Sequence, residues 1–400
     1  MKEQVFELTT AELKKIAGDL QEKIVEGLKA DKQEIAAIPT YINPIENMPD
    51  RKVLALDWGG TNFRAAIVEF NAGKAKVIED KKYPLSAKET IGFNQNKLHE
   101  TMAEMISQLN ALDETVTHIG YCFSYPAECC PNGDAVLLRW TKGIDSSGMI
   151  GELVGEPLLN YLNNYKGIKA KFESIKVIND TVACLFAGLA ESGYDTYIGL
   201  IVGTGTNMAG LMPWNKIEKL NNPSDKLIPV NLESGNFNPP YLTVIDGLVD
   251  ARSNNKGAQR FEKAISGGYL GELFKTAFAH QKIKYNFDGG DLANVINNPT
   301  QFPEEQVKVA KAIWERSAKL VAASLAGLTQ VLLTQNPAIK KIGLAADGSV
   351  FWGKDAQALC GYKKIVVEML QQLLPEGVAI TVLPEMKDPN LIGSAIAALS

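Results

Sequence analysis

Apolar residues along this chain recur in two patterns, at helical spacing and in short continuous runs. Over residues 10–30 they fall three or four positions apart, which predicts an amphipathic helix with Thr10 as its N-cap. A connection with several prolines follows over 38–51. Three apolar runs separated by polar turns then predict a meander of strands, at 53–57, 63–70 and 75–78.

Helices and strands are predicted to alternate in the next part of the chain. A helical face begins at Leu98 and continues to Leu112, and a second helix is expected over 153–165. Short apolar strands are expected at 119–123 and 176–178, with a helix over 181–192 after the second of them. This alternation favours an α/β fold.

The strand–turn–strand pattern of the first meander occurs again near residue 197. A strand over 197–202, a turn over 203–207 and a strand over 208–212 are predicted there. The two turns share the word Gly-Thr-Asn, in GGTNFRAAI (59–67) and TGTNMAGLM (204–212), with apolar residues on both sides. Chance repetition of three residues is the alternative, but the matching flanks favour an internal duplication with two lobes around a cleft.

Composition restricts the class of protein. The chain has 400 residues, 46% hydrophobic and 22% charged, with a net charge of −5, which is ordinary for a globular enzyme of two domains. The acidic balance argues against nucleic acid as a partner, and no apolar run of about 18 residues predicts a membrane span. The first residues, MKEQVFELTT, have no apolar signal region, and the cysteines show no Cys-x-x-Cys spacing, so we expect a cytoplasmic protein with reduced thiols. These cysteines are Cys122, Cys129, Cys130, Cys184 and Cys360.

The first Gly-Thr-Asn turn carries candidate chemistry. Backbone N–H groups of Gly59 to Asn62 can form an anion-binding nest, although a tight hairpin needs no ligand. Asp57 lies beside this turn without a local basic partner, and one carboxylate with phosphate oxygens and water is a set that Mg²⁺ accepts. Two such turns facing a cleft would hold a polyphosphate between them.

Asn179 and Asp180 form the second candidate group. They follow an apolar strand and precede a helix, where an Asn or Asp is favoured as an N-cap. Ligands also bind at such strand ends in open α/β sheets, and a carboxylate there could accept the proton of an attacking hydroxyl. Both interpretations stay open on these residues alone.

An ordered series of motifs makes the chain resemble the eukaryotic-type hexokinase family, from about residue 38 to 351. The first phosphate motif, the sugar-binding signature, the catalytic Asn-Asp-Thr-Val word and the second phosphate motif are followed by three further matches. In this sequence they read LALDWGGTNFR (54–64), CFSYPAE (122–128) with LLRWTKGI (137–144), VINDTVACLFAG (177–188), GLIVGTGTNMAG (199–210), NLESGNF (231–237), GAQRFEKAISGGYLGELF (257–274) and ADGSVF (346–351).

The resemblance implies an ATP-dependent hexokinase that phosphorylates the 6-hydroxyl of a hexose, the first step of glycolysis, with glucose as the expected sugar and mannose or fructose as others. The expected fold is the duplicated actin-like, ribonuclease-H-like α/β fold, with a small lobe of 50–180 plus 385–400 and a large lobe of 1–49 plus 181–384. The last helix, 392–399, would rejoin the small lobe. The expected ligands are the hexose and Mg-ATP, and the expected state is a monomer or homodimer.

The same resemblance implies residue roles. Asp180 would be the general base, and Lys142 would add positive charge at the transferring phosphate. Asp57 would hold Mg²⁺, mainly through ATP and water. The hexose would be bound by Ser124, Tyr125, Thr141, Lys142, Asn179, Asp180, Asn207, Glu233, Gln259 and Glu262. The nucleotide would be bound by Asp57, Gly59, Gly60, Thr61, Asn62, Thr204, Gly205, Gly348 and Ser349.

Three positions depart from the family pattern. Ser234 stands where the family usually has Trp, Trp58 where it has Leu, and Gly268 where Lys is common, which puts one nucleotide contact in doubt. Two alternatives follow for the function. One is a related kinase for another acceptor such as N-acetylglucosamine, and the other is a non-catalytic sugar sensor. A sensor could lose Asp57, Lys142 or Asp180 without penalty, so the presence of all three in this sequence speaks against it.

Overall fold

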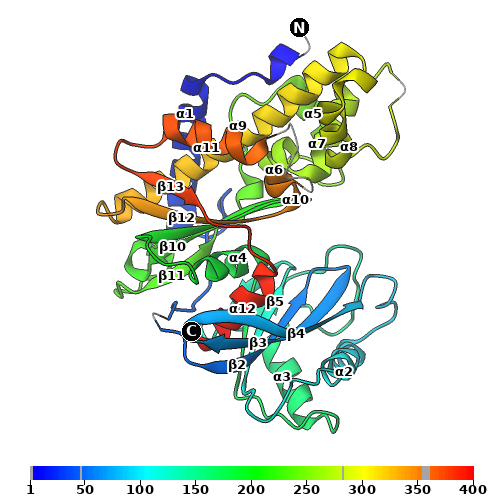
Figure 1. Ribbon diagram of the computed structural model, residues 1–400, viewed down its shortest axis with the longest axis vertical. Coiled ribbons are helices and arrows are strands. Elements are labelled where there is room, and N and C mark those ends of the chain that lie inside the picture. Colours follow the sequence, from blue (N-terminus) through cyan, green and yellow to red (C-terminus); the bar gives the residue numbers. More distant parts are fainter. Residues whose placement is uncertain (1–2, 46, 282, 354–360) are drawn as a thin grey trace. The chain divides into compact units, whose positions relative to one another are not determined.

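The computed structural model describes residues 3–45, 47–281, 283–353 and 361–400, so Cys360 lies outside the described residues. By contacts the chain divides into two compact units (Figure 1). Unit 1 comprises 1–37, 193–225 and 232–385, and unit 2 comprises 38–192, 226–231 and 386–400. The sequence places the lobe boundary before residue 181, whereas the contacts group 181–192 with unit 2, because the helix that begins there packs on the chain's last helix.

Unit 2 is built around a five-stranded sheet in the order β4-β3-β2-β5-β8. β2 and β3 pair antiparallel, as do β3 and β4, while β5 runs parallel to both β2 and β8. A short pair, β6 with β7, and the pair β1 with β11 are antiparallel. The elements are β1 (Ile38–Pro39), β2 (Arg51–Trp58), β3 (Asn62–Asn71), β4 (Lys74–Pro84), α2 (Gln95–Ile106), β5 (His118–Phe123), β6 (Ala127–Cys129), β7 (Ala135–Leu137), α3 (Gly155–Asn164), β8 (Ser174–Ile178), α4 (Asp180–Gly188), β11 (Leu227–Asn231) and α12 (Pro389–Leu399).

Unit 1 contains the strand run β10-β9-β12-β13. β9 and β10 form an antiparallel hairpin, and β12 lies parallel to β9 and β13. The α-helices and strands are α1 (Thr10–Lys29), β9 (Thr196–Val202), β10 (Thr206–Pro213), α5 (Val244–Arg252), α6 (Arg260–Ile265), α7 (Gly267–Ala277), α8 (Gly289–Asn297), α9 (Glu304–Gln335), β12 (Lys341–Asp347), α10 (Ser349–Trp352), α11 (Tyr362–Leu373) and β13 (Ala379–Val382). Short 3₁₀ helices in the described part of unit 1 lie at Glu3–Phe6, Trp214–Lys216, Glu218–Leu220, Ser234–Asn236 and Pro299–Gln301.

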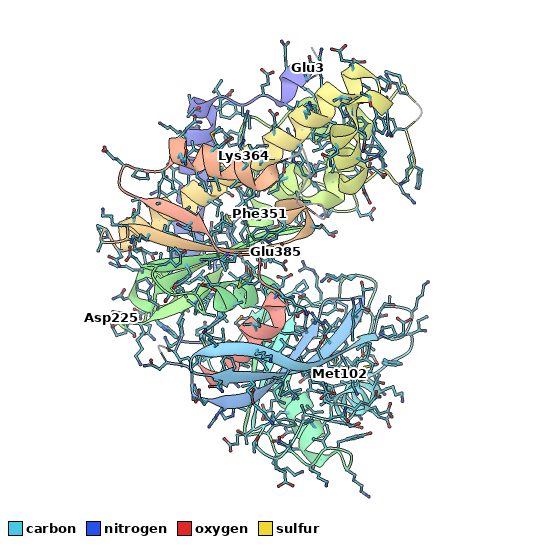
Figure 2. The ribbon with its side chains drawn as sticks, viewed as in Figure 1. Glu3, Met102, Asp225, Phe351, Lys364 and Glu385 are labelled. Atoms are coloured by element: carbon cyan, nitrogen blue, oxygen red, sulfur yellow. The ribbon has the colours of Figure 1, made fainter. Side chains whose placement is uncertain are left out.

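The two units repeat one arrangement, a hairpin followed by a strand parallel to its first member. In unit 2 this is β2–β3 with β5, and in unit 1 it is β9–β10 with β12. This repetition agrees with the predicted duplication. Each unit buries its own core, and Figure 2 labels a residue of each, Met102 in unit 2 and Phe351 in unit 1.

One helix of unit 1 is long and apolar enough to cross a membrane, judged by length and composition over the described residues. It is α9, of 32 residues, and 78% of its most apolar window is buried inside the protein. α9 packs against α1 and α11, which is the position of a core helix in a globular protein.

Several predicted element ends differ from the structure. α1 is capped by Thr9, not Thr10, because Thr9 and Glu12 form a reciprocal capping box. α2 ends at Ile106 although the apolar pattern continues to Leu112, since Leu109 in the following turns still packs into the core of unit 2. α4 ends at Gly188, before the predicted residue 192, and α12 begins at Pro389.

Candidate functional site

One edge of the unit 2 sheet gathers predicted site residues. The parallel strands β2, β5 and β8 end at Trp58, Phe123 and Ile178, so the residues that follow them meet at the same edge. These residues are Gly59, Ser124 and Asn179. Asp180 follows Asn179 directly, and Asp57 is the next-to-last residue of β2, two positions before Gly59. The topology therefore brings the predicted Mg²⁺ ligand, the phosphate turn, a sugar ligand and the predicted base together.

Asp57 has a strongly perturbed ionisation. The pKa of its carboxyl is raised to about 6, chiefly by burial and in smaller part by the negative charge of Asp180, while a hydrogen bond from Asn390 and the charge of Arg64 oppose this rise. Arg64 lies directly across from Asp57 in the β2–β3 register, so the carboxylate does have a basic neighbour. The ion pairs of Arg64 are made with Asp80 and Asp388, at 2.9 and 2.7 Å.

Lys142 covers the first phosphate turn. Its Nζ donates to the backbone carbonyls of Gly59 and Ser124, at 2.9 and 2.8 Å, and lies 5.2 Å from the centre of the Tyr125 ring. Gly60 has φ +101°, and a Cβ there would lie 2.5 Å from Cδ of Lys142. Glycine is thus required at this position both by the backbone and by the lysine above it.

Aromatic side chains support the loop that carries Thr141 and Lys142. Trp58 is fully buried and donates from Nε1 to the carbonyl of Leu85. Its ring makes edge contacts with Tyr125 and Trp140, at 5.1 and 5.6 Å between centroids. The departure from Leu at position 58 therefore contributes packing beneath the site.

The structure decides which residue caps α4. Asn179 is the N-cap, and its Oδ1 accepts from the backbone N–H of Val182 at 2.8 Å. Asp180 occupies the first helical position, and its Oδ1 accepts from the Thr181 hydroxyl at 3.2 Å. The capping interpretation is therefore wrong for Asp180 and right for Asn179, which leaves the Asp180 carboxylate available for another role.

Unit 1 brings together three of its four predicted sugar ligands. Asn207 Nδ2 donates to Glu233 Oε1 at 3.4 Å, and Glu262 Oε2 accepts from the backbone N–H of Thr206 at 3.1 Å. Glu233 has a left-handed backbone with φ 54°. Gln259 also has positive φ and directly precedes α6, the helix that carries Glu262, and its Oε1 accepts a hydrogen bond from Asn255.

The second Gly-Thr-Asn turn lies beside the predicted Gly348–Ser349 segment. The backbone N–H of Gly267 donates to the Gly203 carbonyl at 2.7 Å, and that of Gly268 donates to the Thr204 carbonyl at 3.1 Å. A Cβ at Gly203 would lie 3.4 Å from Cα of Gly348. The start of α7 and the β12–α10 turn thus lie directly against Gly203 and Thr204.

The two turns differ in length despite the shared word. Trp58 pairs with Phe63 across the first turn, which leaves four residues in the loop, whereas Val202 pairs with Thr206 and leaves three. Thr206 is consequently part of β10, and its hydroxyl donates to the carbonyl of Ile201 at 2.9 Å. Thr61 belongs to the loop, so the two threonines are not equivalent.

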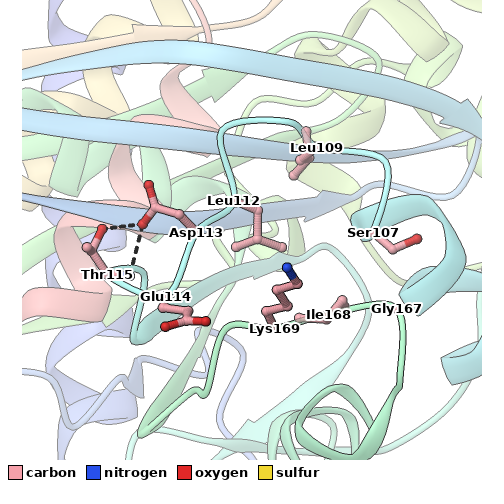
Figure 3. Close-up of a pocket in the computed structure, with 9 residues that line it drawn as sticks. All are labelled: Ser107, Leu109, Leu112, Asp113, Glu114, Thr115, Gly167, Ile168 and Lys169. Atoms are coloured by element: carbon pink, nitrogen blue, oxygen red, sulfur yellow. Dashed lines mark hydrogen bonds between the residues drawn. The ribbon is translucent and has the colours of Figure 1, made fainter.

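A cavity of about 550 Å³ lies elsewhere in unit 2 (Figure 3). The loop that ends at Thr115 lies just before the start of β5 and forms one wall, and Gly167 to Lys169 form another. None of the predicted site residues lines this cavity, because they lie at the other end of the parallel strands.

Sequence reasoning missed Asp388 and Asn390 at the start of α12. Asn390 Nδ2 donates to Asp57 Oδ1 at 3.5 Å, across 333 positions of sequence. No local pattern in the sequence could indicate this contact, because it depends on where the last helix packs.

Comparison with known proteins places the chain in a family. Two hexokinase family models match it, one over residues 2–190 and the other over 197–308 and 304–400. Hexokinase-2 of Schizosaccharomyces pombe is 29% identical, with 98% of this chain and 94% of the relative covered. Hexokinase-1 of Saccharomyces cerevisiae is 27% identical, with 100% and 91% covered.

Solved structures agree on the fold. The hexokinase from Schistosoma mansoni complexed with glucose superposes with a TM-score of 0.81 at 23% identity, and covers 99% of this chain and 97% of its own. A ROK family glucokinase from Streptomyces griseus, in complex with glucose and AMPPNP, has a TM-score of 0.53 at 17% identity, and the match covers 87% of this chain and 99% of that one. The chain has the two-lobed, actin-like sugar kinase fold, belongs to the hexokinase family, and is an ATP-dependent hexokinase.

Proposed function

We propose that this hexokinase transfers the γ-phosphoryl group of Mg-ATP to the 6-hydroxyl of glucose, with Asp180 as the general base. The observation that supports this role most is the position of the Asp180 carboxylate. It stands at the edge of the sheet where β2, β5 and β8 end, and Asn179 provides the cap of α4 in its place. A carboxylate at such an edge that does not cap its own helix can take the proton of a sugar hydroxyl as it attacks.

Lys142 would act on the transferring phosphate. An ammonium has three N–H donors, and the carbonyls of Gly59 and Ser124 take two of them. The third is available for an anionic oxygen. Because the lysine is held directly over the Gly59–Gly60 turn, its charge lies where phosphate oxygens bound by that turn would develop negative charge.

The hexose would be bound largely by carboxylates and amides. Glu233 and Glu262 can accept from sugar hydroxyls, and Asn207 can both donate and accept. Asn207 donates to Glu233, and Glu262 accepts from the backbone N–H of Thr206, which holds these side chains in place within unit 1. Within unit 2, Ser124, Thr141 and Asn179 are the residues for which we propose a role in binding the sugar.

The residues near Asp57 fit a hydrated Mg²⁺ ion. The described residues contain no cluster of three or more His, Cys, Asp and Glu side chains that could enclose a metal alone. They do provide the Asp57 carboxylate and, beside it, the buried Oδ1 of Asn390, which has no hydrogen-bond partner. Mg²⁺ retains several waters and binds through few carboxylates and substrate phosphates, and when bound it would neutralise charge on the nucleotide.

The proposal is tested by measuring ADP release with glucose, mannose, fructose and N-acetylglucosamine, for the wild-type protein and for Asp180→Asn. We expect glucose to have the highest kcat/KM, and the variant to lose about 10²–10⁴-fold in kcat, which is the usual contribution of a general base. Glucose affinity measured by calorimetry should change much less, because an amide still hydrogen-bonds the sugar.

Asp113→Asn is the matched control. Asp113 is another carboxylate of unit 2, paired with Lys52 at 2.8 Å, but it lines the remote cavity and not the predicted site. It should retain wild-type turnover. An Asp180→Asn protein that folds, binds glucose and turns over within about fivefold of wild type would contradict the role of Asp180, and a clear preference for N-acetylglucosamine would overturn the choice of sugar.

A further inference from the structure

The start of α12 makes two contacts with the first hairpin of unit 2. Asp388 has a left-handed backbone with φ 57°, and its carboxylate does not cap its own helix. Instead its Oδ1 lies 2.7 Å from Nη2 of Arg64, on β3. Two positions later, the carboxamide of Asn390 reaches Asp57 on β2, the strand that pairs with β3.

The orientation of the Asn390 carboxamide follows from its neighbour. An ionised carboxylate only accepts hydrogen bonds, so Nδ2 and not Oδ1 must face Asp57. Oδ1 is then buried, and none of the residues that the structure describes donates a hydrogen bond to it. A buried acceptor without a protein donor can take a hydrogen bond from a water or from a group of a bound ligand.

α12 is held firmly enough to fix this contact. A Cβ at Gly120, on β5, would lie 1.9 Å from the carbonyl oxygen of Ser394 on α12. A Cβ at Gly393 would lie 1.8 Å from the carbonyl oxygen of Ala183 on α4. Backbone therefore packs directly on backbone at both places, and α12 supports the strand that precedes Ser124 and the helix that begins with Asp180.

We propose that Asn390 is a positioning residue for nucleotide binding: its Nδ2–H fixes the Asp57 carboxylate, and its Oδ1 accepts a hydrogen bond from a water of the metal–nucleotide complex. Asn390 thus acts through Asp57, and this inference rests on the proposed role of Asp57. The ion pair of Asp388 with Arg64 anchors the helix turn that presents Asn390.

A double-mutant cycle tests the inference. The four proteins are the wild type, Asn390→Leu, Asp57→Asn and the double variant, and the measurement is the calorimetric Kd of AMPPNP with Mg²⁺. Leu matches Asn in size but can neither donate nor accept. We expect Asn390→Leu to weaken binding about tenfold when Asp57 is present, which is the lower range for a hydrogen bond to a charged group, and less than about twofold in the Asp57→Asn background.

Further measurements separate positioning from general damage. Asn390→Leu should leave the Kd for glucose and the melting temperature close to wild type, and Asn390→Ala should reproduce its effect on AMPPNP. Lys387→Ala, an exposed position at the same helix start, should bind AMPPNP as the wild type does. Equal weakening of AMPPNP binding in both backgrounds would show a structural role only and overturn the inference.

The two possible failures are distinguishable. If Asp57→Asn weakens binding but Asn390→Leu does not, the role of Asp57 stands and that of Asn390 falls. If Asp57→Asn binds AMPPNP with Mg²⁺ as tightly as the wild type, the proposed role of Asp57 is wrong, and the role of Asn390 falls with it.

Discussion

Removing the imidazole of His99 should make the protein less sensitive to acid. His99 lies on α2, is 3% exposed, and makes an edge contact with Tyr161 at 6.0 Å between ring centroids. Burial lowers the pKa of this imidazole from 6.5 to about 4. At a pH between these two pKa values, the imidazole binds a proton in the unfolded chain but stays neutral in the folded protein. The free energy of unfolding therefore falls as the pH falls through this window.

The two pKa values set the size of the effect. At pH 7 the imidazole is mostly neutral in both the folded and the unfolded state, and its burial lowers the free energy of unfolding by only about 0.2 kcal/mol. At pH 5 the unfolded imidazole is almost fully charged while the folded one is mostly neutral, and the cost reaches about 2 kcal/mol. His99→Phe retains a ring against Tyr161 but cannot titrate. Between pH 7 and pH 5 its free energy of unfolding should therefore fall by about 2 kcal/mol less than that of the wild type.

Urea unfolding at the two pH values, followed by circular dichroism, measures this difference. The other titrating groups are the same in both proteins. The loss of unfolding free energy between pH 7 and pH 5 therefore differs between wild type and variant only by the contribution of position 99. The absolute stability of the variant at pH 7 does not enter the comparison. Equal losses for both proteins between pH 7 and pH 5 would refute the burial argument.

Three other predictions concern single side chains. Asp246→Asn should lower the free energy of unfolding by about 3–5 kcal/mol, measured by urea unfolding, because it leaves Arg316, 1% exposed and paired bidentately with Asp246, as an uncompensated buried charge. A loss below about 1 kcal/mol would contradict this. Gly60→Ala should lower kcat at least tenfold by displacing Lys142, whereas Gly92→Ala, also at positive φ but with open space around it, should cost only stability. Equal kinetics for the two would exclude displacement of Lys142. Glu262→Gln should lower kcat/KM for glucose about tenfold or more, while the exposed Glu272→Gln should not, and an unchanged Glu262→Gln enzyme would remove Glu262 from the site.

The parts of the fold that the sequence predicted are those determined by local patterns. Both hairpins with Gly-Thr-Asn, the strand before Ser124 and the strand–helix junction at Asn179 all appear where the apolar runs and turn residues indicated. The errors arose where tertiary contacts override local signals. Leu109 was assigned to the helix because it is apolar at helical spacing, but it packs in the core from the loop that follows α2. Thr9 and not Thr10 is the N-cap of α1, because Glu12 completes a capping box only with Thr9.

The candidate site divides in the same way. Asp57, Lys142 and Asp180 were recognisable because each lies in a motif that is continuous in sequence. The support around them was not recognisable: Asn390 and Asp388 reach the site from the last helix, and Arg64 gains its ion partners from β4 and α12. The assignment of the cap to Asn179 required coordinates as well, since both residues of the Asn-Asp pair are favoured caps.

The packing of α12 on unit 2 has a consequence for biosynthesis. Residues 38–192 supply most of this unit, yet the helix at Pro389–Leu399 that lies against β5 and α4 is made roughly 200 residues later. At synthesis rates of about 5–20 residues per second, roughly 10–40 s pass between the synthesis of β5 and α4 and the synthesis of the helix that covers them. During that interval the surfaces of β5 and α4 that will contact α12 are uncovered, and Gly120 lacks its backbone partner, the carbonyl of Ser394. Unit 2 therefore cannot complete its packing until the end of the chain is made, although most of its sequence is already present.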